Sequence, residues 1–168
     1  MWYSLVKDSF IGSPGHIPEV LSGTANVPLD VSVPEQTWSS AALMTATVRG
    51  ILGLDPDVPH HKLRFQPHLP PQLNTVSIHN FRFGSRILQL TLERSSSGIK
   101  LSVVNSGEPF ELEFVPQLLF SGDRVRGFLN GKEVPIRVLS GEHDRHASLT
   151  FIIQQSEQVR IVASDNSR

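Results

Sequence analysis

The chain has 168 residues, of which 39% are hydrophobic and 18% charged, as in ordinary soluble globular proteins. A formal net charge of −1 gives no basic field for nucleic acid or an anionic membrane, and the absence of cysteine excludes disulfides and zinc–thiolate sites. No apolar run is long enough to cross a bilayer and no signal peptide precedes residue 10. We therefore expect a cytoplasmic protein, with no membrane or nucleic-acid partner and one domain or a small domain plus a fragment.

The first ten residues, MWYSLVKDSF, place Leu5, Val6 and Phe10 at helical spacing, which predicts a short helix. Residues 11–35 contain glycine and proline too often for a regular element and are expected to form a loop. Within this loop, Pro18 precedes Glu19, a carboxylate followed by a short apolar run.

A second helix is predicted after the loop, from residue 36 to about Leu52. Ser32 and Glu35 have the spacing of a capping box, and Gly53 is placed to end the helix. Apolar residues occur around its whole circumference, and Arg49 is the only charge between Trp38 and Leu52. Such a helix needs cover on most sides, so we expect a protein partner or further chain over residues 36–52.

Two short motifs, Pro18-Glu19 and Gln36-Thr37-Trp38-Ser39, together with the helix end at Gly53-Leu54, resemble the end of the catalytic domain in amylo-alpha-1,6-glucosidases. These glycosidases, the glucosidase half of glycogen debranching enzymes, are six-hairpin (α/α) barrels. The resemblance implies that residues 1–54 are the truncated end of such a barrel, with the last helical hairpin and an active-site loop. Sister families of six-hairpin hydrolases, such as glucoamylase-like or trehalase-like proteins, remain open.

The resemblance also implies roles for individual residues. Glu19 corresponds to the general base of an inverting hydrolysis, and Gln36 and Trp38 line the sugar pocket. His16 precedes the Pro-Glu pair and is a further candidate for the same pocket. An inverting glycosidase needs two carboxyl groups roughly 6.5–9.5 Å apart. The family's general acid lies on an earlier hairpin, so we expect little or no activity from this chain alone.

From Lys62 onward the hydrophobic pattern changes to period two, typical of half-buried strands. The alternating apolar positions are Leu88/Leu90/Leu92, Ile99/Leu101/Val103, Phe110/Leu112/Phe114, Val134/Ile136/Val138, Leu149/Phe151/Ile153 and Val159/Ile161/Ala163. Turn signals separate them, the strongest being Asn130-Gly131. The phase slips near Asn80, which predicts a bulge or bend.

Eight or nine antiparallel strands of this kind predict a β-sandwich over residues 62–168. Residues 55–61 are expected to be a linker. The fold class is thus mainly β, with a C-terminal antiparallel sandwich preceded by two helices. A β domain after the barrel is also common in the related glycosidases.

The remaining polar clusters have simpler interpretations. His60 and His61 are adjacent, so in an extended segment they point to opposite faces and do not converge on a metal. The segment Glu142–His146 is interpreted as a polar turn between strands. The sequence predicts no metal site and no cofactor.

Three functions from different classes follow. The first is the C-terminal portion of a glycosidase acting on α-glucosidic linkages, with oligosaccharide or a glycogen-like α-glucan as substrate and the missing barrel supplied from elsewhere. The second is an accessory carbohydrate-binding sandwich. The third is a structural module that docks on a glycosidase barrel, with the apolar helix as an interaction surface.

Overall fold

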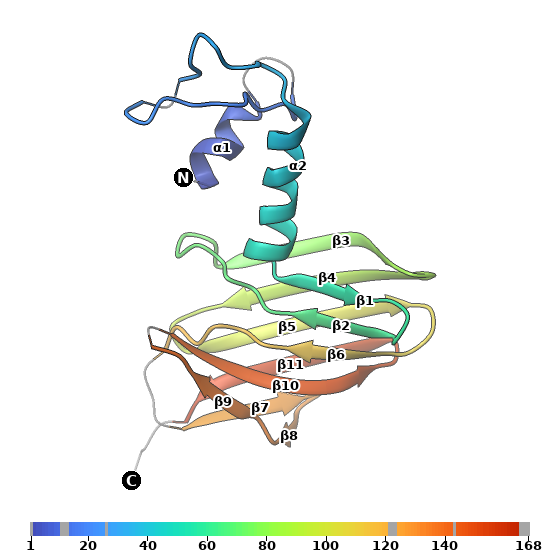
Figure 1. Ribbon diagram of the computed structural model, residues 1–168. Helices are drawn as coiled ribbons and strands as arrows, with labels where there is room; N and C mark the ends of the chain where they lie inside the picture. Colours follow the sequence, from blue (N-terminus) through green and yellow to red (C-terminus); the bar gives the residue numbers. More distant parts are fainter. Residues whose placement is uncertain (1, 11–13, 26, 121–123, 143, 165–168) are drawn as a thin grey trace. The chain divides into compact units, whose positions relative to one another are not determined.

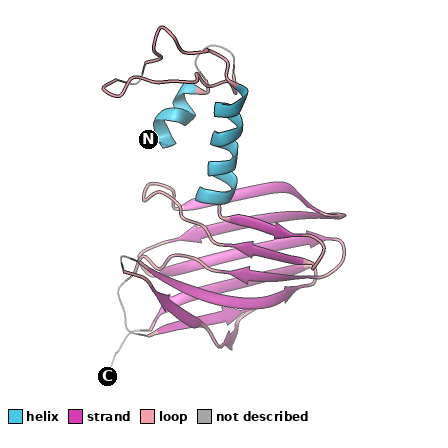
Figure 2. Cartoon of the chain, viewed as in Figure 1, coloured by secondary structure: helices cyan, strands magenta, loops and turns pink. Residues whose placement is uncertain are grey.

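In a computed structural model, the structure describes residues 2–10, 14–25, 27–120, 124–142 and 144–164. The chain forms two compact units, residues 1–50 and 51–168. The first contains the helices and the second the strands (Figures 1 and 2). The predicted fold class, mainly β with two short helices before a sandwich, is confirmed. Within the described ranges, no helix has the length and apolar character needed to span a membrane.

The N-terminal unit contains the two predicted helices, α1 (Trp2–Asp8) and α2 (Thr37–Thr45). A π-helical segment, Ala46–Ile51, follows α2, so the helical conformation ends close to the predicted position. The predicted capping box is wrong. Gln36 occupies the N-cap position without a side-chain cap, and the Ser32 hydroxyl instead accepts a hydrogen bond from the Val20 N–H at 2.9 Å. Ser32 therefore holds the loop and not the helix.

Few side chains of this unit are buried. Among those described up to residue 50, only Asp8 and Ile17 are buried, and α2 has no buried residue. Trp38 is 81% exposed and Val31 is 84% exposed. A helix whose apolar side chains all reach solvent gains little of the burial energy that normally stabilises helices in proteins.

The C-terminal unit begins with a five-stranded sheet. Its order is β1 (Leu54–Asp57), β2 (Lys62–Phe65), β6 (Phe110–Phe114), β10 (Arg145–Ile153) and β9 (Arg137–Ser140). β1 and β2 form an antiparallel hairpin. The segment 55–61, which the sequence indicated as a linker, therefore supplies most of β1 and the turn that follows it.

The second sheet has six strands, all antiparallel to their neighbours. Its order is β3 (Thr75–Phe83), β4 (Arg86–Arg94), β5 (Gly98–Ser106), β11 (Ser156–Ala163), β7 (Val125–Leu129) and β8 (Lys132–Val134). Figure 1 shows the two sheets as the two layers of a sandwich.

The sandwich core is built from the alternating apolar positions. Its largest fully buried side chains include Phe65, Phe83, Phe110 and Phe114. The rings of Phe65 and Phe114 stack at 5.7 Å, and those of Phe83 and Phe110 meet edge to face at 5.3 Å. Aromatic pairs in these geometries add to the energy of burial.

Local turn and bulge predictions are confirmed. Asn130 and Gly131 have φ values of 51° and 81°, the two positive values that a tight two-residue hairpin needs between β7 and β8. The pairing of β3 with β4 shifts register between Ile78 and Phe81, and Asn80 has a φ of 55°. The phase slip in the sequence thus marks a β-bulge.

Two strand predictions need correction. β2 pairs with β6 in parallel, because the chain passes through three strands of the other sheet between them. Val134, Ile136 and Val138 do not form one strand. Pro135 has no N–H for a ladder, and the chain leaves β8 there to join the other sheet as β9.

Candidate functional site

The loop before α2 is closed by backbone hydrogen bonds that bring its two ends together. The Gln36 N–H donates to the Ile17 carbonyl at 3.0 Å, and the Glu19 N–H donates to the Val33 carbonyl at 2.9 Å. Among the described side chains of the unit, Ile17 is one of two that are buried, and it anchors the start of the loop. The loop therefore carries Pro18-Glu19 alongside the residues that lead into the helix, as an active-site loop would require.

The four candidate side chains differ in exposure. Glu19 and His16 are exposed, Gln36 is half-buried, and Trp38 is 81% exposed. Within the described part of the chain, the Glu19 carboxylate has no ion-pair or hydrogen-bond partner. It is therefore free to accept a proton or a hydrogen bond, but the described residues of this unit do not enclose it in a water-excluding pocket.

Two histidines outside this loop lie against carboxylates. His60 Nδ1 lies 2.8 Å from the Asp57 carboxylate, which lowers the pKa of Asp57. His146, which is buried, lies 2.9 Å from the Asp144 carboxylate through Nε2. His143 lies outside the described residues. No set of three or more His, Asp or Glu side chains in the described ranges is arranged to hold a metal ion.

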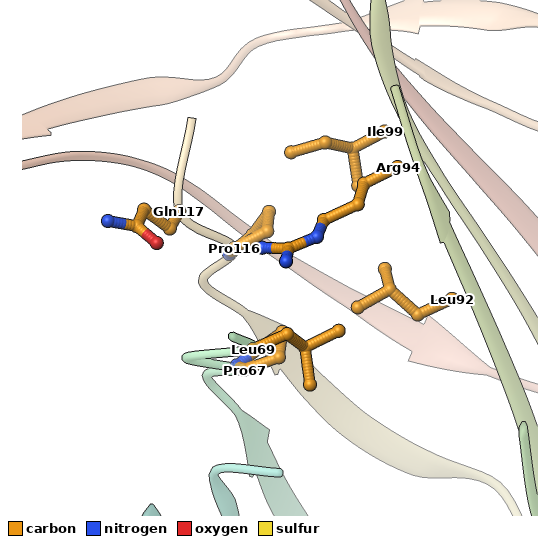
Figure 3. Close-up of a pocket in the computed structure, with 7 residues that line it drawn as sticks. All are labelled: Pro67, Leu69, Leu92, Arg94, Ile99, Pro116 and Gln117. Carbon is orange, nitrogen blue, oxygen red and sulfur yellow. The ribbon is translucent and has the colours of Figure 1, made fainter. Parts of the chain in front are cut away.

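A small pocket lies between the sheets of the sandwich and is too small for a sugar. It is lined by Pro67, Leu69, Leu92, Arg94, Ile99, Pro116 and Gln117 (Figure 3). Its volume of about 10 Å³ is room for about one water. Arg94 extends across it toward Pro116 and donates to the carbonyls of Leu73, at 2.9 Å, and Pro70. These hydrogen bonds hold the loop before β3 against the sandwich. Burial lowers the pKa of the Arg94 guanidinium.

A larger groove, of about 440 Å³, lies on the outside of the sandwich where β2, β6 and β10 meet two turns. Lys62, Glu111 and Ile152 stand in one row across these three strands. Sequence reasoning missed this groove because its residues come from four separate segments. The only local signal was the placement of Lys62 and Glu111 on the polar phase of their strands.

Part of the β unit is similar to a known protein family. Residues 57–115 match the family model for glycosyl hydrolase family 65, C-terminal domain. The match runs from the last residue of β1 through β6 and covers about a third of the chain. No curated protein sequence matches the chain.

Comparison with solved structures supports the fold. The chain is similar to an alpha-L-rhamnosidase from Dictyoglumus thermophilum, with a TM-score of 0.56 and 12% identity, over 87% of this chain and 16% of that one. The matched share exceeds the length of the β unit, so it reaches into the helical unit. The chain thus spans about a sixth of the length of this enzyme.

A second similar structure is a GH127 beta-L-arabinofuranosidase from Geobacillus stearothermophilus T6. Its TM-score is 0.43, with 14% identity over 74% of this chain and 18% of that one. Over residues 57–115, the β unit is thus similar to a C-terminal domain of glycoside hydrolases.

Proposed function

We propose that this chain is the C-terminal part of a glycoside hydrolase that cleaves α-glucosidic linkages of oligosaccharides or glycogen-like glucans with inversion. The observation that carries the proposal is the match of residues 57–115 to the C-terminal domain of glycosyl hydrolase family 65. Directly before this match, the chain carries the loop and helix with Pro18-Glu19 and Gln36-Thr37-Trp38-Ser39. The resemblance of these motifs to amylo-alpha-1,6-glucosidases supplies the choice of an α-glucosidic bond.

In this proposal Glu19 is the general base. Its carboxylate takes a proton from a water molecule as that water attacks the anomeric carbon, and a separate carboxylic acid protonates the leaving oxygen. Trp38 offers its ring to a sugar face, and the Gln36 amide and His16 offer hydrogen bonds to hydroxyls. The free carboxylate of Glu19 and the exposed indole of Trp38 are compatible with these roles.

The proton donor and most of the pocket wall come from other helices of an (α/α) barrel. The described residues contain two short helices, whereas a six-hairpin barrel has twelve. Among the described residues of the helical unit, only two side chains are buried, and this supports a partner or further chain that covers α2. The chain alone is therefore expected to be inactive.

The test is to co-express the full chain with the polypeptide encoded directly upstream of it, and to assay hydrolysis of linear and branched malto-oligosaccharides. We expect no turnover by the chain alone, turnover by the combination, and inverted anomeric configuration in the first product seen by NMR. Glu19→Gln should lower kcat about 10²- to 10⁴-fold. Asp30→Asn, an exposed carboxylate in the same loop, is the matched control and should change kcat less than about threefold.

Three results would contradict the proposal. One is an upstream region that encodes no helical hairpins. Another is a product of retained configuration. The third is a Glu19→Gln variant with the same kcat as Asp30→Asn.

A further inference from the structure

We propose that the outer groove of the sandwich is a binding site for a neutral oligosaccharide, separate from the Glu19 loop. The groove is lined by His60, His61, Lys62, Arg86, Glu108, Pro109, Phe110, Glu111 and Ile152. Its volume of about 440 Å³ falls within the range of small-molecule sites. The choice of an α-glucan as the first ligand to test rests on the proposed function, but the site itself does not.

The charges that line the groove select against an ionic ligand. Lys62 and Arg86 are cationic, Glu108 and Glu111 are anionic, and their formal charges cancel. Lys62 Nζ lies 3.0 Å from the Glu111 carboxylate, so these two charges are already paired. A phosphate or a carboxylate ligand would meet an acid for every base. A neutral ligand with many hydroxyl groups can donate to the carboxylates and accept from the Lys62 ammonium at once.

Arg86 fixes the back of the groove. It is 3% exposed, its Nε donates to the Glu108 carbonyl at 2.7 Å, and one terminal nitrogen donates to the Pro109 carbonyl at 3.0 Å. Its guanidinium also lies 5.4 Å from the centre of the Phe83 ring. The loop that forms one wall is therefore held in place before any ligand arrives, which reduces the entropy cost of binding.

His61 is held in an unusual conformation beside this arginine. Its φ of 55° is in the left-handed region, which a side chain with a Cβ adopts at a cost. The same terminal nitrogen of Arg86 lies 2.7 Å from His61 Nδ1. Because a guanidinium is only a donor, Nδ1 must accept, and the neutral ring then carries its proton on Nε2 as a donor for a ligand.

The floor of the groove combines polar and apolar atoms in the way a sugar ring needs. Glu111 stands between Lys62 and Ile152 in the registers of β2, β6 and β10. Ile152 is 49% exposed, so an aliphatic surface lies beside the ion pair. A sugar ring has hydroxyl groups on its edges and C–H groups on its faces, and it can contact both kinds of surface.

The experiment is an NMR titration of the isotope-labelled full chain with maltohexaose, cellohexaose and inorganic phosphate in separate arms. We expect saturable shifts at His61, Lys62, Glu111 and Ile152 with an oligosaccharide, and none with phosphate. The double variant Lys62→Met/Glu111→Gln should weaken binding at least tenfold. His61→Gly, in which glycine adopts the same backbone conformation without strain, should weaken it about fivefold while the fold is kept.

The matched control is the double variant Lys100→Met/Glu93→Gln. This exposed ion pair, 3.6 Å apart, joins two neighbouring strands of the other sheet. The control should leave the dissociation constant within about twofold. The inference is overturned by saturable phosphate shifts at these residues without oligosaccharide shifts, by no saturable binding at all, or by equal loss in the control.

The titrations with the two sugars also distinguish a failure of this inference from a failure of the proposed function. Binding of cellohexaose but not maltohexaose at the groove would support a neutral oligosaccharide site and count against an α-glucan substrate. Absence of binding to either sugar would overturn the groove site and leave the Glu19 variant test unaffected.

Discussion

Gly53, which joins the helical segment to β1, gives the sharpest test of the structure. Its φ is 64°, and a Cβ on this residue would lie 1.8 Å from the carbonyl oxygen of Gln66 and 2.3 Å from its carbonyl carbon. The Gln66 N–H donates to the Gly53 carbonyl at 2.8 Å. Glycine is therefore needed here both for the conformation and for the close approach of two backbone segments.

Gly53→Ala should destabilise the sandwich by about 2–3 kcal/mol. The left-handed conformation costs alanine roughly 1–2 kcal/mol. Relief of the overlap requires the segments to separate by more than an ångström, which breaks the hydrogen bond from Gln66 at a cost of about 1 kcal/mol. For a unit of this size the corresponding fall in Tm is about 10 °C.

The matched control is Gly131→Ala. Gly131 also has a positive φ, 81°, but nothing lies within 4 Å of the added Cβ. Gly131→Ala should therefore lower the free energy of unfolding only by the cost of the left-handed conformation, roughly 1–2 kcal/mol. Urea unfolding of the full chain, followed by far-ultraviolet circular dichroism, measures both. If Gly53→Ala costs no more than Gly131→Ala, the close approach of residues 53 and 66 is wrong.

Three further predictions concern the sandwich. Phe114→Ala, which empties a fully buried site stacked on Phe65, should lower the free energy of unfolding by roughly 3–5 kcal/mol, measured by urea denaturation. Asn105→Leu leaves three backbone carbonyls without their side-chain donor and should cost roughly 1–3 kcal/mol in the same assay. The hydrogen bond from Arg126 holds the pKa of Glu133 below its usual 4.5, so this pair stabilises the fold above that pH and less as the pH falls through the lowered pKa. Arg126→Met should raise the Glu133 pKa in an NMR carboxylate titration; an unchanged value would show that the pair does not form in solution.

The buried faces, the hairpin turn and the bulge of the sandwich can be predicted from short stretches of the sequence. The alternation of apolar and polar residues determines which side of a strand is buried, because successive side chains point to opposite faces. Asn130-Gly131 selects a tight hairpin, since both residues tolerate positive φ, and the phase slip at Asn80 marks a bulge. These features depend on neighbouring residues only, so they are predictable before any partner strand is known.

The candidate site was only partly accessible in this way. The candidate residues Glu19, Gln36, Trp38 and His16 were predicted from the sequence. The closure of their loop depends on the backbone hydrogen bonds from Gln36 to Ile17 and from Glu19 to Val33. Their catalytic roles stay predictions, because the other walls of a pocket are not among the described residues. The predicted capping box is wrong because the Ser32 hydroxyl accepts a hydrogen bond from the Val20 N–H instead of capping the helix. Val20 is twelve residues away, so the local spacing of Ser32 and Glu35 does not reveal this contact.

Pairing between distant segments was decided by the tertiary structure alone. Nothing near Lys62 in the sequence says that β2 lies parallel to β6, or that Lys62, Glu111 and Ile152 form one row beside a strained His61. The partners of a strand depend on which arrangement buries the most apolar surface for the whole chain, at the cost of closing long loops. The sequence by itself therefore determined the strands, their buried faces and their turns, whereas the fold determined which strands meet and the groove that they form.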